Sequence, residues 1–401
     1  MKKVSGNPEI IIPGFKFAGI PAGIKTSGER DLALIFSESP AVTAALFTTN
    51  KIKAAPVRLS MERLASHKKC RSIIINSGNA NACTGKPGLK NAREMMIKTA
   101  EELGISTELV CVSSTGKIGV PLPMEKIKRA LPALVRNLSP LSLNHAASAI
   151  LTTDTATKIS SRKVKIGRKT GIIAGIAKGS GMIRPGMATM LSFIVTDISI
   201  NPKALDSALR EAVNRSFNRI TVDNEMSTND TVMMMANGNL RNIPLTMRAA
   251  VYSRFKGALN DVTYDLARMI AEDGEGATKL IEIIVRGAKT ESDAENVASS
   301  VANSMLVKTA VYGRDPNWGR IMAAAGYSGA AVDEQKIDIY INKIKLASKG
   351  MGTDKESAAR KTLANKKILI TIDLGIGKET SAVLTCDLTE EYVKINAHYG
   401  T

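Results

Sequence analysis

The sequence predicts a layered α/β or α+β protein, because short β-rich runs recur along the chain with amphipathic helical segments between them. At 401 residues and 44% hydrophobic content, the chain is long enough for two or three domains with substantial cores. The predicted strands, in chain order, are 72–75, 109–113, 171–177, 190–196, 281–285, 336–341 and 368–372.

Two helices have recognisable starting signals. One begins at about Pro202, with Asn201 as its cap, and a second begins near Ser292, where Ser292 and Glu295 have the spacing of a capping box. The apolar residues of the first helix recur one turn apart, and they are Leu205, Leu209, Val213 and Phe217. Those of the second are Ala294, Val297, Ala298, Val301 and Met305. The basic run 162–169 is predicted to be an exposed strand or hairpin.

Domain boundaries rest on weaker signals, a basic segment at 241–258 and a glycine-rich passage at 326–329. They predict a main α/β domain over 1–240, a second α/β domain over 241–330 and a small β-rich C-terminal domain over 331–401. The tail of the last domain alternates apolar and polar residues, so we expect it to dock as a strand that reaches the active site.

Composition narrows the class of protein. No apolar run approaches the roughly 20 residues of a membrane span, and the basic start has no adequate apolar segment for a signal peptide. We therefore expect a cytoplasmic protein without a membrane partner. The formal net charge of +18 could attract nucleic acid, anionic lipid or an acidic small substrate, but aromatic residues make up only 4%. A lysine-rich solvated surface is the simpler interpretation, no nucleic-acid partner is expected, and a basic nucleic-acid-binding protein is the rival from another functional class.

Familiar catalytic signatures are missing. The pair Gly116–Lys117 is followed by Ile118 where a phosphate-binding loop needs Ser or Thr. The cysteines have no C-x-x-C pair and the histidines are single, so we predict neither a metal site nor a histidine-based triad. These residues are Cys70, Cys83, Cys111, Cys386, His67, His145 and His398.

One stretch, 177–191, has glycines and a proline crowded before an apolar strand, with Thr189 at the junction. A threonine hydroxyl is a poor nucleophile unless a base removes its proton, and its own free α-amino group can be that base. The unperturbed pKa of such a group is about 7.7–8.0, so no histidine is required. The amine exists only if the Ala188–Thr189 bond is cut. The hydroxyl of Thr189 attacking the Ala188 carbonyl would make that cut.

Several long motifs carry a resemblance that covers essentially the whole chain. They are INSGNANACTG at 75–85, SSTGKIG at 113–119, TTDT at 152–155, KGSGMIRPGMATML at 178–191, DNEMSTNDT at 223–231, DGEGATK at 273–279, YGRDPNWGRIMAAAGYSG at 312–329 and the terminal YVKINAHYGT. Together, and in this order, they resemble the ornithine acetyltransferase / glutamate N-acetyltransferase family of arginine biosynthesis.

The resemblance implies a fold superficially like that of N-terminal-nucleophile hydrolases and an α chain of 1–188 that stays associated with a β chain of 189–401. It implies a ping-pong transfer of the acetyl group from N2-acetylornithine to glutamate through Thr189, with Thr115 and Gly116 as the oxyanion hole. No metal or organic cofactor is implied, and a bifunctional member also accepts acetyl-CoA. The family suggests an (αβ)₂ or larger assembly. The implied substrate contacts are Thr152, Lys178, Thr189, Glu275, Asn396 and Thr401.

The chain departs from the family pattern just before the cut, where Arg184 and Gly186 replace a small apolar residue and an asparagine. Gly186 keeps a turn feasible there and can loosen it, which affects the rate of cleavage more than its position. The nearest rival function is an autoprocessed aminopeptidase or amidase, in which water resolves the acyl-enzyme.

Overall fold

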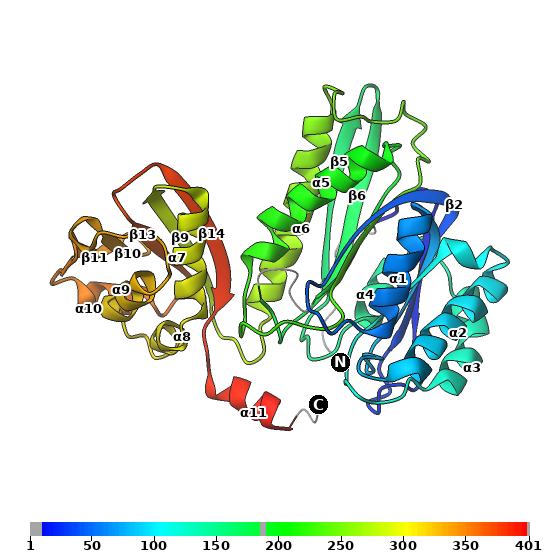
Figure 1. Ribbon diagram of the computed structural model, residues 1–401, viewed down its shortest axis with the longest axis horizontal. Coiled ribbons are helices and arrows are strands. Elements are labelled where there is room, and N and C mark those ends of the chain that lie inside the picture. The colour runs from blue at the N-terminus through cyan, green and yellow to red at the C-terminus, as the bar shows by residue number, and fades with distance from the viewer. Residues whose placement is uncertain (1–9, 185–189, 399–401) are drawn as a thin grey trace.

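The structure is a computed structural model that describes residues 10–184 and 190–398. Within these ranges the chain forms two β-sheets, each with helices packed against it (Figure 1). This confirms the predicted mixed α/β class. The sheets lie side by side, with the C-terminal one forming the smaller lobe (Figure 1).

The large sheet contains eight strands of the described chain in the order β4-β3-β2-β8-β7-β6-β5, with β1 paired to β2 off this path. The pairs β3/β4 and β7/β8 are parallel and the other neighbours are antiparallel. The strands are β1 (Phe15–Ile20), β2 (Leu32–Phe47), β3 (Lys69–Asn76), β4 (Val110–Ser114), β5 (Lys158–Ile166), β6 (Lys169–Lys178), β7 (Leu191–Thr196) and β8 (Thr231–Ala236).

Helices cover this sheet on both faces. On β7, Ile194 belongs to the core formed with α5 (Pro202–Arg215) and α6 (Tyr252–Glu272), whereas its neighbour Phe193 belongs to the core formed with α4 (Leu143–Ala149). Three further helices pack over the part of the sheet that is formed by β1 to β4, namely α1 (Ala55–Ser66), α2 (Gly85–Leu103) and α3 (Met124–Arg136). Burial on both faces explains why β7 is apolar at successive positions.

The smaller sheet has six strands of the described chain in the order β12-β11-β10-β13-β9-β14. They are β9 (Leu280–Ala288), β10 (Asp338–Ile341), β11 (Ile344–Ser348), β12 (Met351–Gly352), β13 (Lys367–Asp373) and β14 (Glu379–Cys386). Four helices accompany them, α7 (Glu291–Asn303), α8 (Met305–Tyr312), α9 (Trp318–Gly326) and α10 (Glu356–Thr362). After β14, the last helix α11 (Glu390–His398) runs back toward the large sheet (Figure 1).

The predicted helix starts are confirmed in one case and wrong in detail in the other. The Asn201 side chain accepts a hydrogen bond from the Lys203 N–H at 2.9 Å, as a cap should. The second helix is capped by Thr290, whose Oγ1 accepts from the Asp293 N–H at 3.0 Å, and not by Ser292. Thr290 is extended in backbone conformation while Ser292 already lies inside the helix, so Ser292 cannot serve as the cap.

Two other expectations concern the basic run and the tail. The run 162–169 forms the end of the β5–β6 hairpin, as predicted. The tail is the helix α11 and not a strand, so that prediction is wrong. Glu390 and Glu391 lie in the first turn of α11, where acidic side chains stabilise a helix. The three-part domain division stays a prediction, and α6 packs on the large sheet while β9 begins the smaller one.

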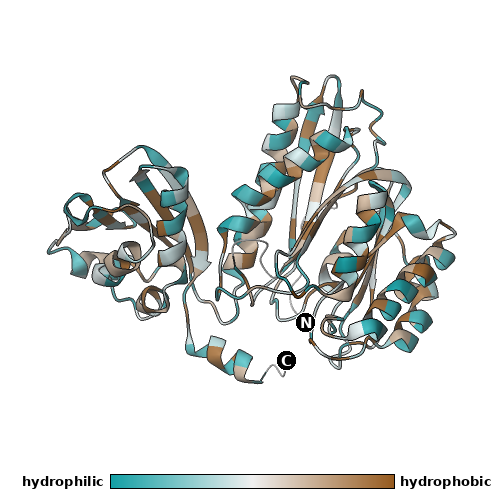
Figure 2. Cartoon of the chain, in the orientation of Figure 1, coloured by the Kyte–Doolittle hydropathy of each residue, from teal (hydrophilic) through white to brown (hydrophobic). Residues whose placement is uncertain are grey.

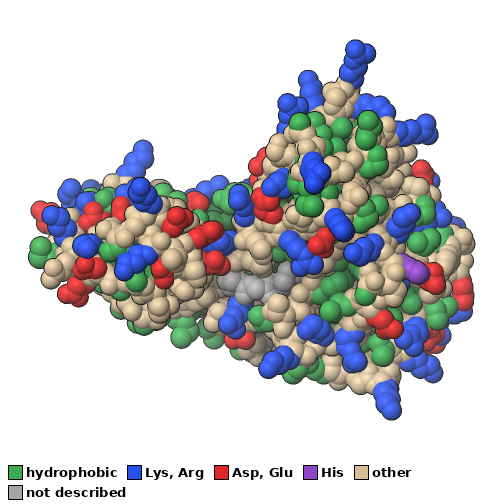
Figure 3. Space-filling model, turned by 45° about the horizontal axis from the view of Figure 1, so that its top comes forward, with side chains coloured by type: hydrophobic (Ala, Val, Ile, Leu, Met, Phe, Trp, Pro, Cys, Tyr) green, Lys and Arg blue, Asp and Glu red, His purple; other side chains and the backbone are tan. Residues whose placement is uncertain are grey.

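The distribution of side chains matches this arrangement. Apolar residues follow the strands and hydrophilic ones the outer sides of the helices (Figure 2). Lys and Arg side chains are spread over the face shown in Figure 3 and do not gather into one patch. None of the helices in the described part of the chain is both long and apolar enough to cross a membrane.

Candidate active site

Thr115 and Gly116 follow directly after β4 and are held tightly against the loop that follows β3. The Thr115 N–H donates to the Asn76 carbonyl oxygen at 3.0 Å. Gly116 has a φ of +132°, and a Cβ at this position would lie 2.3 Å from the carbonyl carbon of Gly78. Only glycine fits such a close approach of two backbone segments. The candidate oxyanion loop is therefore fixed by its neighbours.

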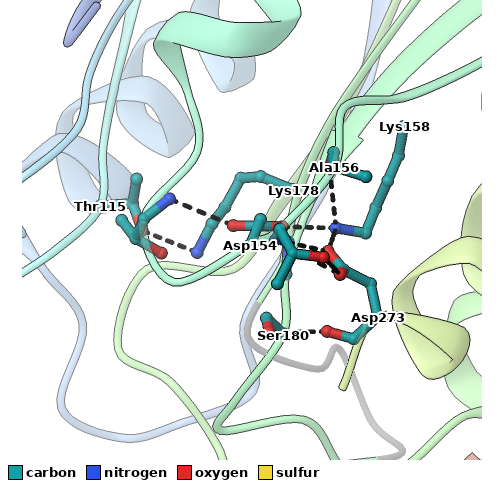
Figure 4. Close-up of polar contacts among 10 residues, drawn as sticks. Thr115, Asp154, Ala156, Lys158, Lys178, Ser180 and Asp273 are labelled. Carbon is teal, nitrogen blue, oxygen red and sulfur yellow. Dashed lines mark hydrogen bonds and ion pairs between the residues drawn. The ribbon is translucent and has the colours of Figure 1, made fainter. Parts of the chain in front are cut away.

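Lys178, the last residue of β6, brings a buried ammonium to this loop. Its Nζ donates to Thr115 Oγ1 at 3.2 Å (Figure 4). Because this oxygen accepts from Lys178, the hydroxyl proton of Thr115 is left to donate to another acceptor. Burial lowers the pKa of Lys178, although the negative charges of Asp154, Asp230 and Glu275 oppose that shift.

Asp154 organises the turn that follows β6. Its Oδ1 accepts hydrogen bonds from the Gly179 N–H at 2.7 Å and from Lys158 Nζ at 2.6 Å. Lys158 Nζ also pairs with Asp273 Oδ2 at 2.6 Å, and Ser180 Oγ donates to the Asp273 carbonyl oxygen at 2.7 Å (Figure 4). These contacts anchor the turn to the loop after α6. None of these three residues, Asp154, Lys158 and Asp273, is among the site residues expected from the sequence.

We expect Asp154 to make the free energy of unfolding depend on pH in the acid range. Burial opposes its ionisation, but the charges of Lys158 and Lys178 prevail and lower its pKa from 3.8 to about 2. A difference of this size corresponds to about 2 kcal/mol of stabilisation, fully present above pH 3.8 and lost as the pH falls through 2. Urea unfolding of the wild type and of Asp154→Asn should give a difference in free energy that shrinks over that window. A difference that does not change with pH would contradict this assignment.

Glu275 and Asn396 meet at the same place from different parts of the chain. The Glu275 N–H donates to the Ser180 carbonyl oxygen at 2.9 Å, and Asn396 Nδ2 donates to Glu275 Oε2 at 2.8 Å. A Cβ on Gly181 would lie 2.3 Å from this carboxylate, so glycine is needed there. Helix α11 is also held by Tyr392, whose hydroxyl lies 3.2 Å from Asp223 Oδ2. The C-terminal helix thus reaches the site on the large sheet.

All the predicted site residues that the structure describes line one pocket, which we name the reaction pocket. Its volume is about 110 Å³, below the roughly 300–1,000 Å³ of pockets for drug-sized ligands, so it suits a molecule the size of an amino acid. The predicted residues in its lining are Thr115, Gly116, Thr152, Lys178, Glu275 and Asn396. The other predicted positions, Ala188, Thr189 and Thr401, lie outside the described residues.

Two carboxylates flank the predicted cleavage site, the half-buried Asp223 and the fully buried Asp230, and neither is among the site residues expected from the sequence. Asp223 accepts from the N–H groups of Met182 and Ile183, at 2.6 and 2.8 Å. Asp230 Oδ1 accepts from the Met190 N–H at 3.1 Å, and burial raises the pKa of Asp230 well above its usual range. Both belong to the motif DNEMSTNDT. The sequence signal that could have identified Asp223 and Asp230 is the cluster of acidic and amide residues between a helix and a buried strand.

Comparison with known proteins identifies the family of this chain. The model of the ArgJ family matches residues 16–401. The arginine biosynthesis bifunctional protein ArgJ of Geobacter sulfurreducens is 48% identical over 392 residues, covering 97% of this chain and all of its own length. The protein of the same name from Caldanaerobacter subterraneus subsp. tengcongensis is 49% identical over 393 residues, 97% of each chain.

A solved structure is also similar. The crystal structure of ArgJ from Bacillus halodurans is 46% identical with a TM-score of 0.51, and the match covers 52% of this chain and 99% of that chain. With a family match from residue 16 to the C-terminus, this chain belongs to the ArgJ family.

Proposed function

We propose that the chain is an acetyltransferase of arginine biosynthesis that moves the acetyl group of N2-acetylornithine to glutamate through Thr189. The observation that carries this proposal is the convergence of Thr115, Gly116, Lys178 and Glu275 on one pocket of amino-acid size, in a chain of the ArgJ family. The words "arginine biosynthesis bifunctional protein" in the names of its relatives support the same activity.

Self-cleavage comes first in the proposed sequence of events. The Thr189 hydroxyl attacks the Ala188 carbonyl carbon, its proton passes to the Thr189 nitrogen, and the peptide C–N bond breaks to free the α-amine. Water then hydrolyses the resulting ester, which releases the Ala188 carboxylate and restores the Thr189 hydroxyl. Asp223 and Asp230 support this step because they hold the backbone on either side of the segment. Asp230 Oδ2 is buried without a hydrogen-bond partner in the described structure, so it is an acceptor that the new amine could satisfy. The Bacillus halodurans chain, about half the length of this one, is consistent with a processed relative.

Acetyl transfer then takes two similar steps. In the first, the Thr189 hydroxyl gives its proton to its own α-amine and attacks the acetyl carbonyl of N-acetylornithine. The C–N bond breaks, the proton passes to the departing ornithine amine, and Thr189 keeps the acetyl group as an ester. In the second, the amine of glutamate attacks this ester, the C–O bond to Thr189 breaks, and the Thr189 oxygen takes up the proton that the amine loses. The Thr115 hydroxyl and the Gly116 N–H stabilise the negative oxygen in both steps.

Glu275, held by Asn396, supplies the negative charge that the side-chain ammonium of ornithine needs. We expect Glu275→Gln to lower kcat/KM for N-acetylornithine about 10- to 100-fold, the typical effect of losing a hydrogen bond to a charged group. N-acetylnorvaline, which lacks the ammonium, is the matched control substrate. Its kcat/KM should be nearly the same in both proteins, and an equal loss on both substrates would show that Glu275 has only a structural role.

The proposal also covers the substrate carboxylate, the need for cofactors, the location of the enzyme and its assembly. Lys178 has ammonium protons beyond the one given to Thr115, and these can pair with the substrate carboxylate. The cycle requires no metal or organic cofactor. We place the enzyme in the cytoplasm, with its two processed chains associated as (αβ)₂ or larger.

Dependence on glutamate tests the reaction class. Purified protein incubated with N-acetylornithine should release ornithine continuously only when glutamate is present, with N-acetylglutamate formed in equal amount. Continuous release of ornithine and acetate without glutamate would instead favour the amidase alternative, in which water takes the acetyl group.

A further inference from the structure

The C-terminal helix α11 contributes no buried side chain to a hydrophobic core. None of its residues in the described structure is buried, and Val393 is exposed. Burial of apolar side chains therefore adds little to the free energy that holds α11 in place. The helix nevertheless runs back toward the large sheet (Figure 1), where hydrogen bonds and one close backbone approach attach it to loops around the reaction pocket.

Two contacts fix the start of α11 against the loop that follows α6. Thr389, directly before the helix, donates from its Oγ1 to the Gly276 carbonyl oxygen at 2.7 Å. A Cβ on Gly276 would lie 2.5 Å from the backbone nitrogen of Tyr392. Only glycine permits two backbone segments to approach so closely. The first turn of α11 is therefore held against this loop, and the Tyr392 side chain extends from that turn.

One carboxylate joins Tyr392 to the backbone that precedes the predicted cut. The Tyr392 hydroxyl donates to Asp223 Oδ2 at 3.2 Å. The same oxygen accepts from the Met182 N–H at 2.6 Å, and Asp223 Oδ1 accepts from the Ile183 N–H at 2.8 Å. Asp223 is therefore shared between the C-terminal helix and residues 182–183, two parts of the chain that lie far apart in the sequence.

Asp223 holds the backbone at a point where the chain is strained. Met182 has a φ of +58°, in the left-handed region that residues other than glycine rarely occupy. The hydrogen bond from its N–H to Asp223 offsets that cost. The next residue, Ile183, is fully buried, and its carbonyl oxygen accepts from Thr221 Oγ1 at 3.0 Å. The chain is thereby fixed up to Ile183, five positions before Ala188.

We propose that Tyr392 is a positioning residue for self-cleavage, which acts through Asp223 on the backbone before Ala188. This inference rests on the proposed function, because the bond that is cut and the groups that cut it stay the same. Attack of a hydroxyl on a carbonyl carbon requires a narrow range of distance and direction, so a loosened backbone reacts more slowly. Helix α11 is the last element of the described chain, so it is synthesised after the others. Cleavage therefore becomes fast only after α11 has docked, when the two parts of the chain are already folded together.

The test measures the rate of self-cleavage in full-length chains made by cell-free translation. After synthesis is stopped, the uncleaved chain is followed over time on a denaturing gel. We expect Tyr392→Phe to be cleaved about tenfold more slowly than the wild type, or slower still, the typical effect of losing a hydrogen bond to a charged group. Tyr327→Phe is the matched control, because Tyr327 is exposed and directly follows α9 on the smaller lobe. It should be cleaved at the wild-type rate.

The pH dependence of cleavage separates this role from a purely structural one. Burial raises the pKa of Asp223, and the hydrogen bonds that its carboxylate accepts, including the one from Tyr392, oppose that rise. Without the hydroxyl the pKa of Asp223 should rise further, and only the ionised carboxylate accepts with both oxygens. The acid side of the rate profile should therefore move to higher pH in Tyr392→Phe. The other titratable groups near this pair are the same in both proteins, and they are Glu225, Glu275 and Cys386.

A comparison with Asp223 variants shows whether Tyr392 acts through that carboxylate. Asp223→Asn keeps one acceptor oxygen but loses the charge, so it should slow cleavage by itself. Tyr392→Phe should then slow cleavage much less in the Asp223→Asn protein than in the wild type. Folding is checked in chains that also carry Thr189→Ala and so remain whole. In these chains Tyr392→Phe should leave the temperature of thermal unfolding nearly unchanged, because α11 has no buried residue.

Any of five results would overturn the inference. The first three are cleavage of Tyr392→Phe at the wild-type rate, an equal slowing in Tyr327→Phe, and an acid side of the rate profile that does not move. The other two are fully multiplicative losses with Asp223→Asn and a clearly lower unfolding temperature in Tyr392→Phe. The wild type shows which idea has failed. If it is never cleaved the proposed function falls, and if it is cleaved only the role of Tyr392 falls.

Discussion

A Thr189→Ala variant is expected to remain one chain of 42.7 kDa with no acetyltransferase activity. The hydroxyl that would attack the Ala188 carbonyl is gone, so no amine is released and no acyl ester can form. The wild type should give two fragments of about 20 and about 23 kDa, in proportion to their lengths. A denaturing gel and an intact mass measure both states.

Thr189→Ser is the matched control, because it keeps a hydroxyl at the same position. This variant should still be cleaved, at a different rate, and should retain measurable transfer. Cleavage after Ala188 in the Thr189→Ala variant would show that another group makes the cut. The mechanism would then have to be abandoned.

Thr115→Val is expected to lower kcat about 10²- to 10³-fold, the typical effect of removing one donor from an oxyanion hole. The valine side chain has nearly the shape of threonine but cannot donate to the tetrahedral oxygen. Thr115→Ser should keep most of the activity. The measurement is single-turnover acetylation of the cleaved enzyme by N-acetylornithine, so that product release does not contribute.

A double-mutant cycle between Thr115 and Lys178 tests whether Lys178 orients the Thr115 hydroxyl. Lys178 Nζ lies 3.2 Å from Thr115 Oγ1, so part of the effect of Lys178→Met should act through Thr115. The loss in the Thr115→Val/Lys178→Met protein should be clearly smaller than the product of the two single losses. Fully multiplicative losses would mean that the two side chains act independently, and wild-type rates in Thr115→Val would remove Thr115 from the oxyanion hole.

Single helices and strands could be predicted because the residues that determine them are close together in the sequence. The helix after Asn201 depends on a cap, a proline and apolar residues one turn apart, and all three are adjacent in the sequence. The strand order depends on contacts between distant segments, such as the pairing of β2 with β8, which the alternation of residues cannot reveal. The C-terminal tail was mistaken for a strand because its short alternating pattern outweighed the acidic first turn of a helix.

The site could be predicted where long motifs place polar residues at the ends of strands. Thr115 follows β4 and Lys178 ends β6, and the fold brings them together across 63 positions of sequence. Asp154, Asp223 and Asp230 were not predicted because each binds the backbone N–H of a residue that is at least 25 positions away in the sequence. A carboxylate that stabilises a buried turn looks like any surface carboxylate until the turn is seen.

The acyl-Thr189 intermediate is tested most directly by the mass of the enzyme after incubation with N-acetylornithine in the absence of glutamate. We expect two chains, of which the one beginning Thr-Met-Leu-Ser is heavier by one acetyl group, carried on Thr189 in peptide mapping. Added glutamate should remove that acetyl group. A single uncleaved chain in active enzyme, or an acetyl group on any other residue, would contradict it.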